Sequence, residues 1–137
     1  MALTHLVDTS VLTRLRRPEV REIVVPLASA GQLGRATISD LEICYSARNA
    51  REWDDLTEAL EAFDLVEIHA HHFDRARQVQ RALASTGQRG RKIPDLLIAA
   101  AAEERRLNLL HYDNDFDLIA AVTGQAADWV VPAGTID

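Results

Sequence analysis

The stretch Leu3-Thr4-His5-Leu6-Val7-Asp8-Thr9-Ser10 joins a short apolar run to a carboxylate and two further residues that commonly begin a helix. Residues 3–7 have the length of a buried strand, and Asp8, Thr9 and Ser10 offer cap residues for a helix after it. Strands that alternate with helices form α/β sheets, in which ligands bind outside the carboxyl ends of the strands. We therefore expect Asp8 to lie at the ligand-binding edge of a sheet.

Other carboxylates occupy similar places further along the chain. Each stands where an apolar segment ends or a helix begins: Glu42, Asp95, Asp113 and Asp115. One sheet edge could gather them into a single pocket. Clustered carboxylates repel one another and cost stability unless a cation lies among them. The pattern suggests a divalent metal ion and phosphate chemistry.

Each of these acids also has a purely structural explanation. Ser39-x-x-Glu42 fits a capping box, in which Glu42 would accept a hydrogen bond from the Ser39 backbone N–H. Asp95 suits the first turn of a helix, and Asp8 and Asp113 could be caps. A cap tolerates Ser or Asn, whereas a metal site requires anionic oxygen. The coincidence of four such positions around one predicted sheet edge favours the metal site.

The order of elements predicts one α/β domain over residues 1–137. Strands are predicted over residues 3–7, 35–38, 65–68, 108–111 and 129–131. Helices are predicted over residues 11–15, 18–30, a segment through Ile43 and Tyr45, 53–63, 73–83, 95–106 and 116–122. This alternation predicts a mostly parallel sheet covered on both faces by helices.

Composition and charge narrow the class of protein. The single Cys44 excludes an internal disulfide and fits a reducing compartment, where we interpret it as a packed core residue. There is no apolar run long enough to span a bilayer and no signal-peptide pattern, so we expect a soluble cytoplasmic protein. The net charge of −6 argues against a sequence-independent nucleic-acid binder. Divalent ions bound by the carboxylates would offset part of that negative charge.

Basic and histidine-rich segments are weaker signals. Arg89, Arg91 and Lys92 form a flexible basic loop just before Asp95, either solvated or in contact with the phosphate backbone of a nucleic acid. Another local cluster consists of His69, His71 and His72. It lacks a second Cys or His pair at zinc-finger spacing, which favours surface or capping roles.

The chain resembles the PIN-domain ribonucleases, and most closely the VapC-type toxins of toxin–antitoxin pairs. The segments that carry the resemblance are Val7-Asp8-Thr9-Ser10, Ser39-Asp40-Leu41-Glu42-Ile43, Pro94-Asp95-Leu96-Leu97-Ile98-Ala99-Ala100 and His111-Tyr112-Asp113-Asn114-Asp115-Phe116. Each motif alone is weak, but the four occur in the family's order. The resemblance implies a PIN-like three-layer α/β/α fold with about five strands.

The same resemblance implies an endoribonuclease that depends on Mg²⁺ or Mn²⁺, forms a homodimer and is inhibited by a cognate antitoxin. The implied acidic quartet is Asp8, Glu42, Asp95 and Asp113. Asp115 matches an additional acid of the last motif, and Ser10 matches a polar residue near the metal. His111 stands where many members have Thr or Ser, which leaves open whether Asp113 or Asp115 contacts the metal directly.

Two alternative functions remain beside the ribonuclease. A phosphohydrolase with an aspartyl nucleophile typically has D-x-D after the first strand, whereas this chain has Asp8-Thr9-Ser10. A non-catalytic PIN-like module would bind RNA or protein without cleaving it. The complete acidic quartet favours the ribonuclease over both.

Overall fold

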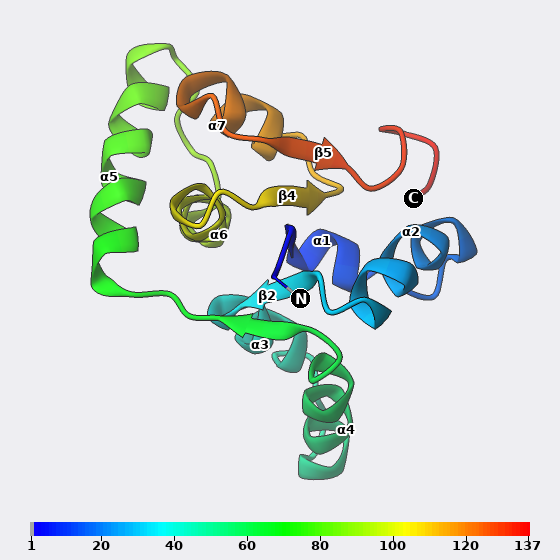
Figure 1. Cartoon of the computed structure of the whole chain (residues 1–137). Helices are drawn as coiled ribbons and strands as arrows, with labels where there is room; N and C mark the ends of the chain where they lie inside the picture. Colours follow the sequence, from blue (N-terminus) through cyan, green and yellow to red (C-terminus); the bar gives the residue numbers. More distant parts are fainter. Residues whose placement is uncertain (1) are drawn as a thin grey trace.

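The computed structural model describes residues 2–137 and contains a sheet of five strands that all pair in parallel (Figure 1). The strands are β1 (His5–Val7), β2 (Leu33–Ala36), β3 (Asp64–Val66), β4 (Asn108–His111) and β5 (Ala127–Trp129). Their order in the sheet is β3-β2-β1-β4-β5. Because β1 lies in the centre, the residues after β1, β2 and β4 meet at one edge of the sheet. This is the edge at which the sequence predicts the acids.

The helices are α1 (Thr9–Leu12), α2 (Pro18–Ser29), α3 (Thr37–Cys44), α4 (Ala50–Leu60), α5 (Ala70–Ser85), α6 (Ile93–Glu104) and α7 (Asp115–Thr123). Figure 1 shows α5 and α6 on one side of the sheet and α2 on the other. The predicted three-layer α/β/α architecture is confirmed. Within residues 2–137, no helix is both long enough and apolar enough to cross a membrane.

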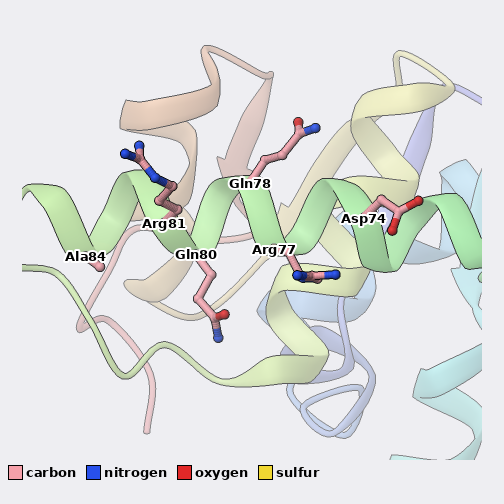
Figure 2. Close-up of a pocket in the computed structure, with 6 residues that line it drawn as sticks. All are labelled: Asp74, Arg77, Gln78, Gln80, Arg81 and Ala84. Atoms are coloured by element: carbon pink, nitrogen blue, oxygen red, sulfur yellow. The ribbon is translucent and has the colours of Figure 1, made fainter.

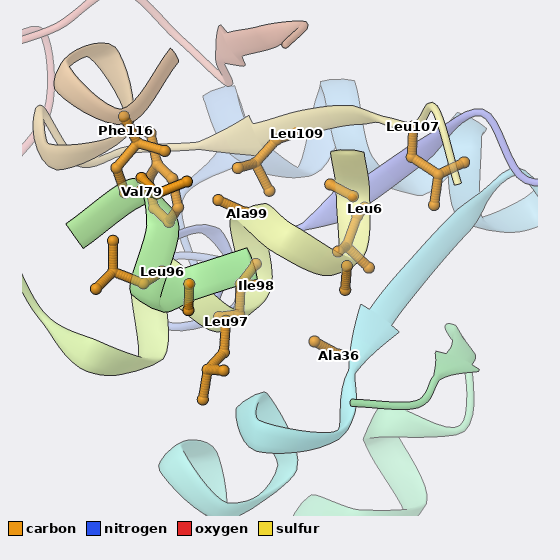
Figure 3. Packing of buried hydrophobic residues seen from close by; sticks show 14 of the residues in the cluster. Leu6, Ala36, Val79, Leu96, Leu97, Ile98, Ala99, Leu107, Leu109 and Phe116 are labelled. Atoms are coloured by element: carbon orange, nitrogen blue, oxygen red, sulfur yellow. The ribbon is translucent and has the colours of Figure 1, made fainter. Parts of the chain in front are cut away.

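Successive strand residues feed two separate cores, since side chains alternate between the faces of a sheet. Leu6 and Leu109 pack with residues of α5, α6 and α7, as Figure 3 shows for Ile98 and Phe116. The next residues, Val7 and Leu110, pack on the opposite face with residues of α1 and α2. Helix α6 is buried from residue 95 to residue 102. It is therefore apolar nearly all round, as expected of a helix enclosed by other elements.

The structure corrects the end of the second predicted strand and the capping box. Thr37 and Ile38, predicted as strand, belong to α3, whose N-cap is Ala36. Ser39 is therefore inside the first turn and is not the N-cap. The predicted strand over residues 65–68 instead ends at Val66. The reason is local: the Ile68 N–H donates to the Thr37 hydroxyl at 3.1 Å and is therefore not available for pairing with β2.

The structure also moves the start of α5 and the position of β5. Helix α5 begins at Ala70, because the His69 N–H donates to Nδ1 of His72 at 2.8 Å and closes the first turn. The predicted capping role is confirmed, but His72 is buried and not on the surface. Strand β5 ends at Trp129, where it pairs with His111 at the end of β4. The predicted strand over residues 129–131 therefore begins two residues earlier.

Candidate active site

The predicted acidic quartet lines one pocket at the carboxyl ends of the central strands. The pocket has a volume of about 250 Å³ and is lined by Asp8, Thr9, Ser10, Thr13, Arg14, Glu42, Lys92, Asp95, Tyr112 and Asp113. Asp115 approaches from the side: one carboxylate oxygen each of Asp95, Asp113 and Asp115 lie within 4.8 Å of one another. The structure thus brings together all five acids that the sequence places at this edge.

Asp8 is both a helix cap and a buried acid with a free oxygen. Its Oδ2 accepts the Ser10 N–H at 2.9 Å, at the start of α1. Its Oδ1 is buried without a hydrogen-bond partner in the described structure. Burial raises the pKa of Asp8 to about 6, against the lowering effect of the Ser10 hydrogen bonds. The capping role occupies one oxygen and leaves the other for a ligand.

Asp95 has the most strongly perturbed carboxyl in the pocket. It lies in the first turn of α6 and is 6% exposed. Its Oδ2 is also buried without a hydrogen-bond partner in the described structure, and Nζ of Lys92 lies 4.0 Å from it. Burial, followed by the negative charge of Asp8, raises the pKa of Asp95 to about 8. Two such neighbouring acids hold a proton or a cation, because their ionised forms are destabilised by burial and repulsion.

Glu42 is tied to the first strand–helix junction and not to the start of its own helix. The Thr9 hydroxyl donates to Oε1 of Glu42 at 2.6 Å and lies 2.9 Å from the buried hydroxyl of Ser39. These contacts span 30 or more residues of sequence and join α1 to α3. The capping-box interpretation is therefore wrong, and Glu42 lines the pocket beside Asp8.

Asp113 and Asp115 form a turn that opens α7. Oδ1 of Asp113 accepts the Asp115 N–H at 2.9 Å, and Oδ2 accepts Nζ of Lys92 at 2.6 Å. Burial raises the pKa of Asp113, but the hydrogen bonds from Lys92 and Asp115 outweigh it and hold the pKa below its usual value. Oδ1 of Asp115 accepts Nη1 of Arg91 at 2.8 Å. Each acid thus has a basic residue of the loop before α6 as its partner.

Ser10 and His111 form hydrogen bonds that hold the turn after β4 in place. The Ser10 hydroxyl oxygen accepts the Tyr112 N–H at 2.9 Å and so links the ends of β1 and β4. His111 is fully buried, and its Nδ1 accepts the Asp113 N–H at 3.3 Å. Burial lowers the pKa of His111, which favours the neutral ring that such an acceptor requires. Both residues therefore position the turn that carries Asp113.

Arg14 is a pocket residue that the sequence reasoning missed. Its Nη1 donates to the Ser10 carbonyl at 2.7 Å, and its guanidinium lies 4.9 Å from the centre of the Tyr112 ring. These contacts hold a cation at the rim of an otherwise acidic pocket. In the sequence, Arg14 stands six residues after Asp8, in the helix predicted to follow the same strand. This position could have indicated a residue near the pocket, but many residues share such a position.

The oxygen atoms of the pocket fit a hard divalent cation. Mg²⁺ and Mn²⁺ prefer carboxylate oxygens, and two buried oxygens, Oδ1 of Asp8 and Oδ2 of Asp95, have no hydrogen-bond partner in the described structure. A cation would remove the penalty of ionising both acids. The residues present therefore match the metal that the family resemblance implies.

A second group of possible metal ligands does not fit a metal equally well. Nε2 of His71 and His72 lie 2.5 and 2.8 Å from the Glu104 carboxylate. However, Nδ1 of His72 accepts the His69 N–H, so Nε2 carries the proton of a neutral ring. A metal at Nε2 would require that the helix cap be broken or that the ring lose both protons. We interpret this cluster as the junction between α5 and α6.

A larger hollow, of about 610 Å³, lies on the outer side of α5 (Figure 2). Its lining residues all come from that helix: Asp74, Arg77, Gln78, Gln80, Arg81 and Ala84. Figure 2 shows these side chains extending in different directions along the helix and not converging on one point. This hollow is therefore a surface groove along one helix.

Comparison with known proteins agrees with this geometry. The family model described as PIN domain matches residues 5–122. The chain is 64% identical over 137 residues to Ribonuclease VapC51 of Mycobacterium tuberculosis (strain ATCC 25618 / H37Rv), covering 100% of both chains. It is 43% identical to Ribonuclease VapC18 of the same strain, covering 98% of this chain and 100% of the relative.

Solved structures with the same fold include two DNA-bound complexes. One is VapBC2 from Rickettsia felis bound to a promoter DNA fragment, with a TM-score of 0.76 and 15% identity over 94% of this chain and 98% of the other. Another is DNA-bound VapBC from Salmonella typhimurium, with a TM-score of 0.76 and 17% identity over 94% and 99%. At these identities the likeness concerns the fold alone.

Proposed function

The chain belongs to the PIN-domain family, and from this premise we propose that it is an endoribonuclease and the toxin of a toxin–antitoxin pair. The observation that carries the proposal is a pair of buried oxygens, one on Asp8 and one on Asp95, that have no hydrogen-bond partner in the described structure and lie in the same pocket as Glu42 and Asp113. Full-length identity of 64% to a ribonuclease supports the same activity.

We further propose that Asp8, Asp95, Asp113 and Asp115 hold Mg²⁺ or Mn²⁺. A bound ion of this kind lowers the pKa of water, orients the phosphodiester and stabilises charge on the attacking and leaving oxygens. Glu42 has Oε1 engaged by the Thr9 hydroxyl, which leaves Oε2 to accept a proton from water. Cleavage would leave a 5′-phosphate and a 3′-hydroxyl.

RNA would approach through the basic residues at the rim of the pocket. Arg14 presents a guanidinium, whose planar set of donors suits phosphate oxygens. We assign the same role to Arg89, Arg91 and Lys92 of the loop before α6, although Arg14, Arg91 and Lys92 are each paired with an acid in this structure. Such contacts position the backbone without reading its sequence.

We expect Arg14→Gln to raise the KM for RNA about tenfold with little change in kcat, because it removes one charge-assisted phosphate contact. Arg16→Gln is the matched control, since Arg16 has a 77% exposed side chain and does not line the pocket. Initial rates at several RNA concentrations, with thermal unfolding as a check on folding, measure both variants. Equal KM values for the two variants would remove Arg14 from the substrate site.

We propose a cognate antitoxin as the partner that covers this pocket, and a homodimer as the assembly of the toxin. The fold match to chains solved within VapBC assemblies supports a partner of this kind. An RNA substrate also implies that the protein acts in the cytoplasm.

The test of the function is cleavage of a panel of cellular RNAs by antitoxin-free protein. We expect discrete fragments whose downstream products carry a 5′-phosphate, which a 5′-phosphate-dependent exonuclease would then degrade. A non-catalytic module that only binds RNA would shift RNA in a gel without producing fragments. That result would favour the binding-module alternative over the ribonuclease.

A further inference from the structure

Three acids of the pocket, Asp95, Asp113 and Asp115, already face positively charged side chains of the same protein. Lys92 donates to Oδ2 of Asp113 at 2.6 Å and lies 4.0 Å from Oδ2 of Asp95. Arg91 donates to Oδ1 of Asp115 at 2.8 Å. These three acids are the group whose oxygens lie within 4.8 Å of one another. Two cations of one short loop therefore occupy the oxygens that a metal would use.

Few contacts other than these ion pairs hold the loop in place. Within residues 2–137, the backbone N–H groups of residues 89–92 donate to no backbone carbonyl. Gly87 and Gly90 have φ of +79° and +84°, a region that favours glycine, and a Cβ added at either would meet no non-neighbouring atom within 4 Å. The loop has two permissive backbone positions, and the side chain of Lys92 is 62% exposed, whereas that of Arg91 is 26% exposed. Residues 87–91 can therefore shift and the Lys92 side chain can turn away from the acids, while the Lys92 carbonyl still accepts the Leu96 N–H at the start of α6.

We propose that Lys92 and Arg91 are internal counter-ions, which occupy the acids of the metal-free protein and are displaced when a divalent cation binds. This inference rests on the proposed metal site. The displaced side chains would then lie free at the rim of the pocket, beside the incoming RNA phosphates. Metal loading would thus add two cations to the rim of the pocket, where Arg14 already lies.

The arrangement of the oxygens prevents a divalent ion and the Lys92 ammonium from binding there together. Oδ1 of Asp113 is engaged by the Asp115 N–H, so Oδ2 is the oxygen free of the turn, and Lys92 holds it. The same ammonium faces Oδ2 of Asp95, which has no hydrogen-bond partner in the described structure. A divalent ion among these oxygens would meet an ammonium at close range, and the two like charges repel. One of them must leave.

Arg89 provides a matched control within the same loop. Its side chain forms no ion pair with the described residues, although it carries the same charge a few residues away. Arg89→Gln and Lys92→Gln therefore remove one positive charge each from nearly the same place. A long-range electrostatic effect would change the metal affinity of both variants similarly. Displacement of an ammonium from the acids predicts a change in Lys92→Gln alone.

The first experiment is a calorimetric titration of metal-free protein with Mn²⁺. We expect Lys92→Gln to tighten binding about tenfold, Arg89→Gln to change it less than about twofold, and Lys92→Arg to resemble the wild type. Equal effects of Lys92→Gln and Arg89→Gln would overturn the displacement. Binding of Mn²⁺ by neither wild type nor variants, with all of them folded by circular dichroism, would overturn the proposed metal site itself.

The second experiment detects release of the loop in the wild type. Trypsin cleaves after Arg and Lys, so we expect Mg²⁺ to accelerate cleavage after Arg91 and Lys92. Cleavage after Arg48, whose side chain is 87% exposed, serves as the internal reference for any effect of Mg²⁺ on trypsin. Unchanged or slower cleavage of the loop relative to Arg48 would contradict release.

Discussion

Asp95→Asn is expected to abolish RNA cleavage while making the metal-free protein more stable at pH 8. Loss of a metal-ligating charge should lower activity on the order of 10³-fold. The gain in stability arises because Asp95 is 6% exposed and has a pKa of about 8, raised first by burial and then by the charge of Asp8. The folded protein therefore carries a penalty for ionising Asp95 that the unfolded chain does not.

The sign of this penalty sets its pH dependence. A carboxyl with a raised pKa in the folded state binds more protons there than in the unfolded chain, so stability falls as pH rises. The penalty is absent below about pH 4 and complete above about pH 8, where removing it should add on the order of a few kcal/mol to the free energy of unfolding. Urea unfolding in EDTA at pH 4.5, 6 and 8 measures the difference.

Asp55→Asn is the control, because Asp55 is exposed on α4, away from the pocket. We expect it to leave cleavage unchanged and to shift the free energy of unfolding equally at all three pH values. Full cleavage by Asp95→Asn would show that Asp95 is not needed for the reaction. A variant that is less stable than the wild type at pH 8 would show that Asp95 serves mainly as a structural residue of α6.

The affinity for metal is expected to rise steeply between pH 6 and pH 8. With a pKa of about 8, Asp95 is largely protonated at neutral pH, and its proton must leave before the oxygens can ligate a cation. Binding should therefore tighten by up to about tenfold per pH unit in this range and level off above pH 8. Asp8, with a pKa of about 6, adds to the slope at lower pH.

Proton release provides an independent measurement of the same effect. Titration with Mn²⁺ at pH 7 in buffers of different ionisation enthalpy should show that up to about one proton is released per bound ion. The observed heat should then vary linearly with the ionisation enthalpy of the buffer. An affinity that does not change between pH 6 and pH 8, with no proton released, would contradict a protonated Asp95.

Much of the site was predictable because its residues follow local rules. Asp8 and Asp113 each stand where a strand meets a helix, and parallel strands bring such places together at one edge. Asp95 lies in the first turn of a helix that follows a loop, and its place was indicated by the apolar run that it opens. The predicted bounds of β4, Asn108 to His111, are confirmed: the strand has Leu109 and Leu110 at its centre and is followed by a turn that contains Asp113 and Asp115. The cap explanation for Asp8 was also correct, but it accounts for a single oxygen.

The remaining features depend on contacts between residues far apart in the sequence. Glu42 is held by Thr9, 33 residues away, and Lys92 is bound to Asp113, 21 residues away. A local pattern assigned Glu42 to its own helix and treated Lys92 as a solvated or RNA-binding residue. Arg14 was missed for the same reason, because only the folded chain places it at the rim of the acidic pocket.

We propose that RNA cleavage requires both the buried carboxylates at the sheet edge and a divalent metal. The most direct test of this claim is cleavage of RNA by antitoxin-free wild type, Asp8→Ala and Asp55→Ala, each with Mg²⁺, Mn²⁺ or EDTA. We expect the same discrete fragments from wild type and Asp55→Ala with metal, and none from Asp8→Ala or in EDTA. Cleavage that survives both Asp8→Ala and EDTA would contradict the claim.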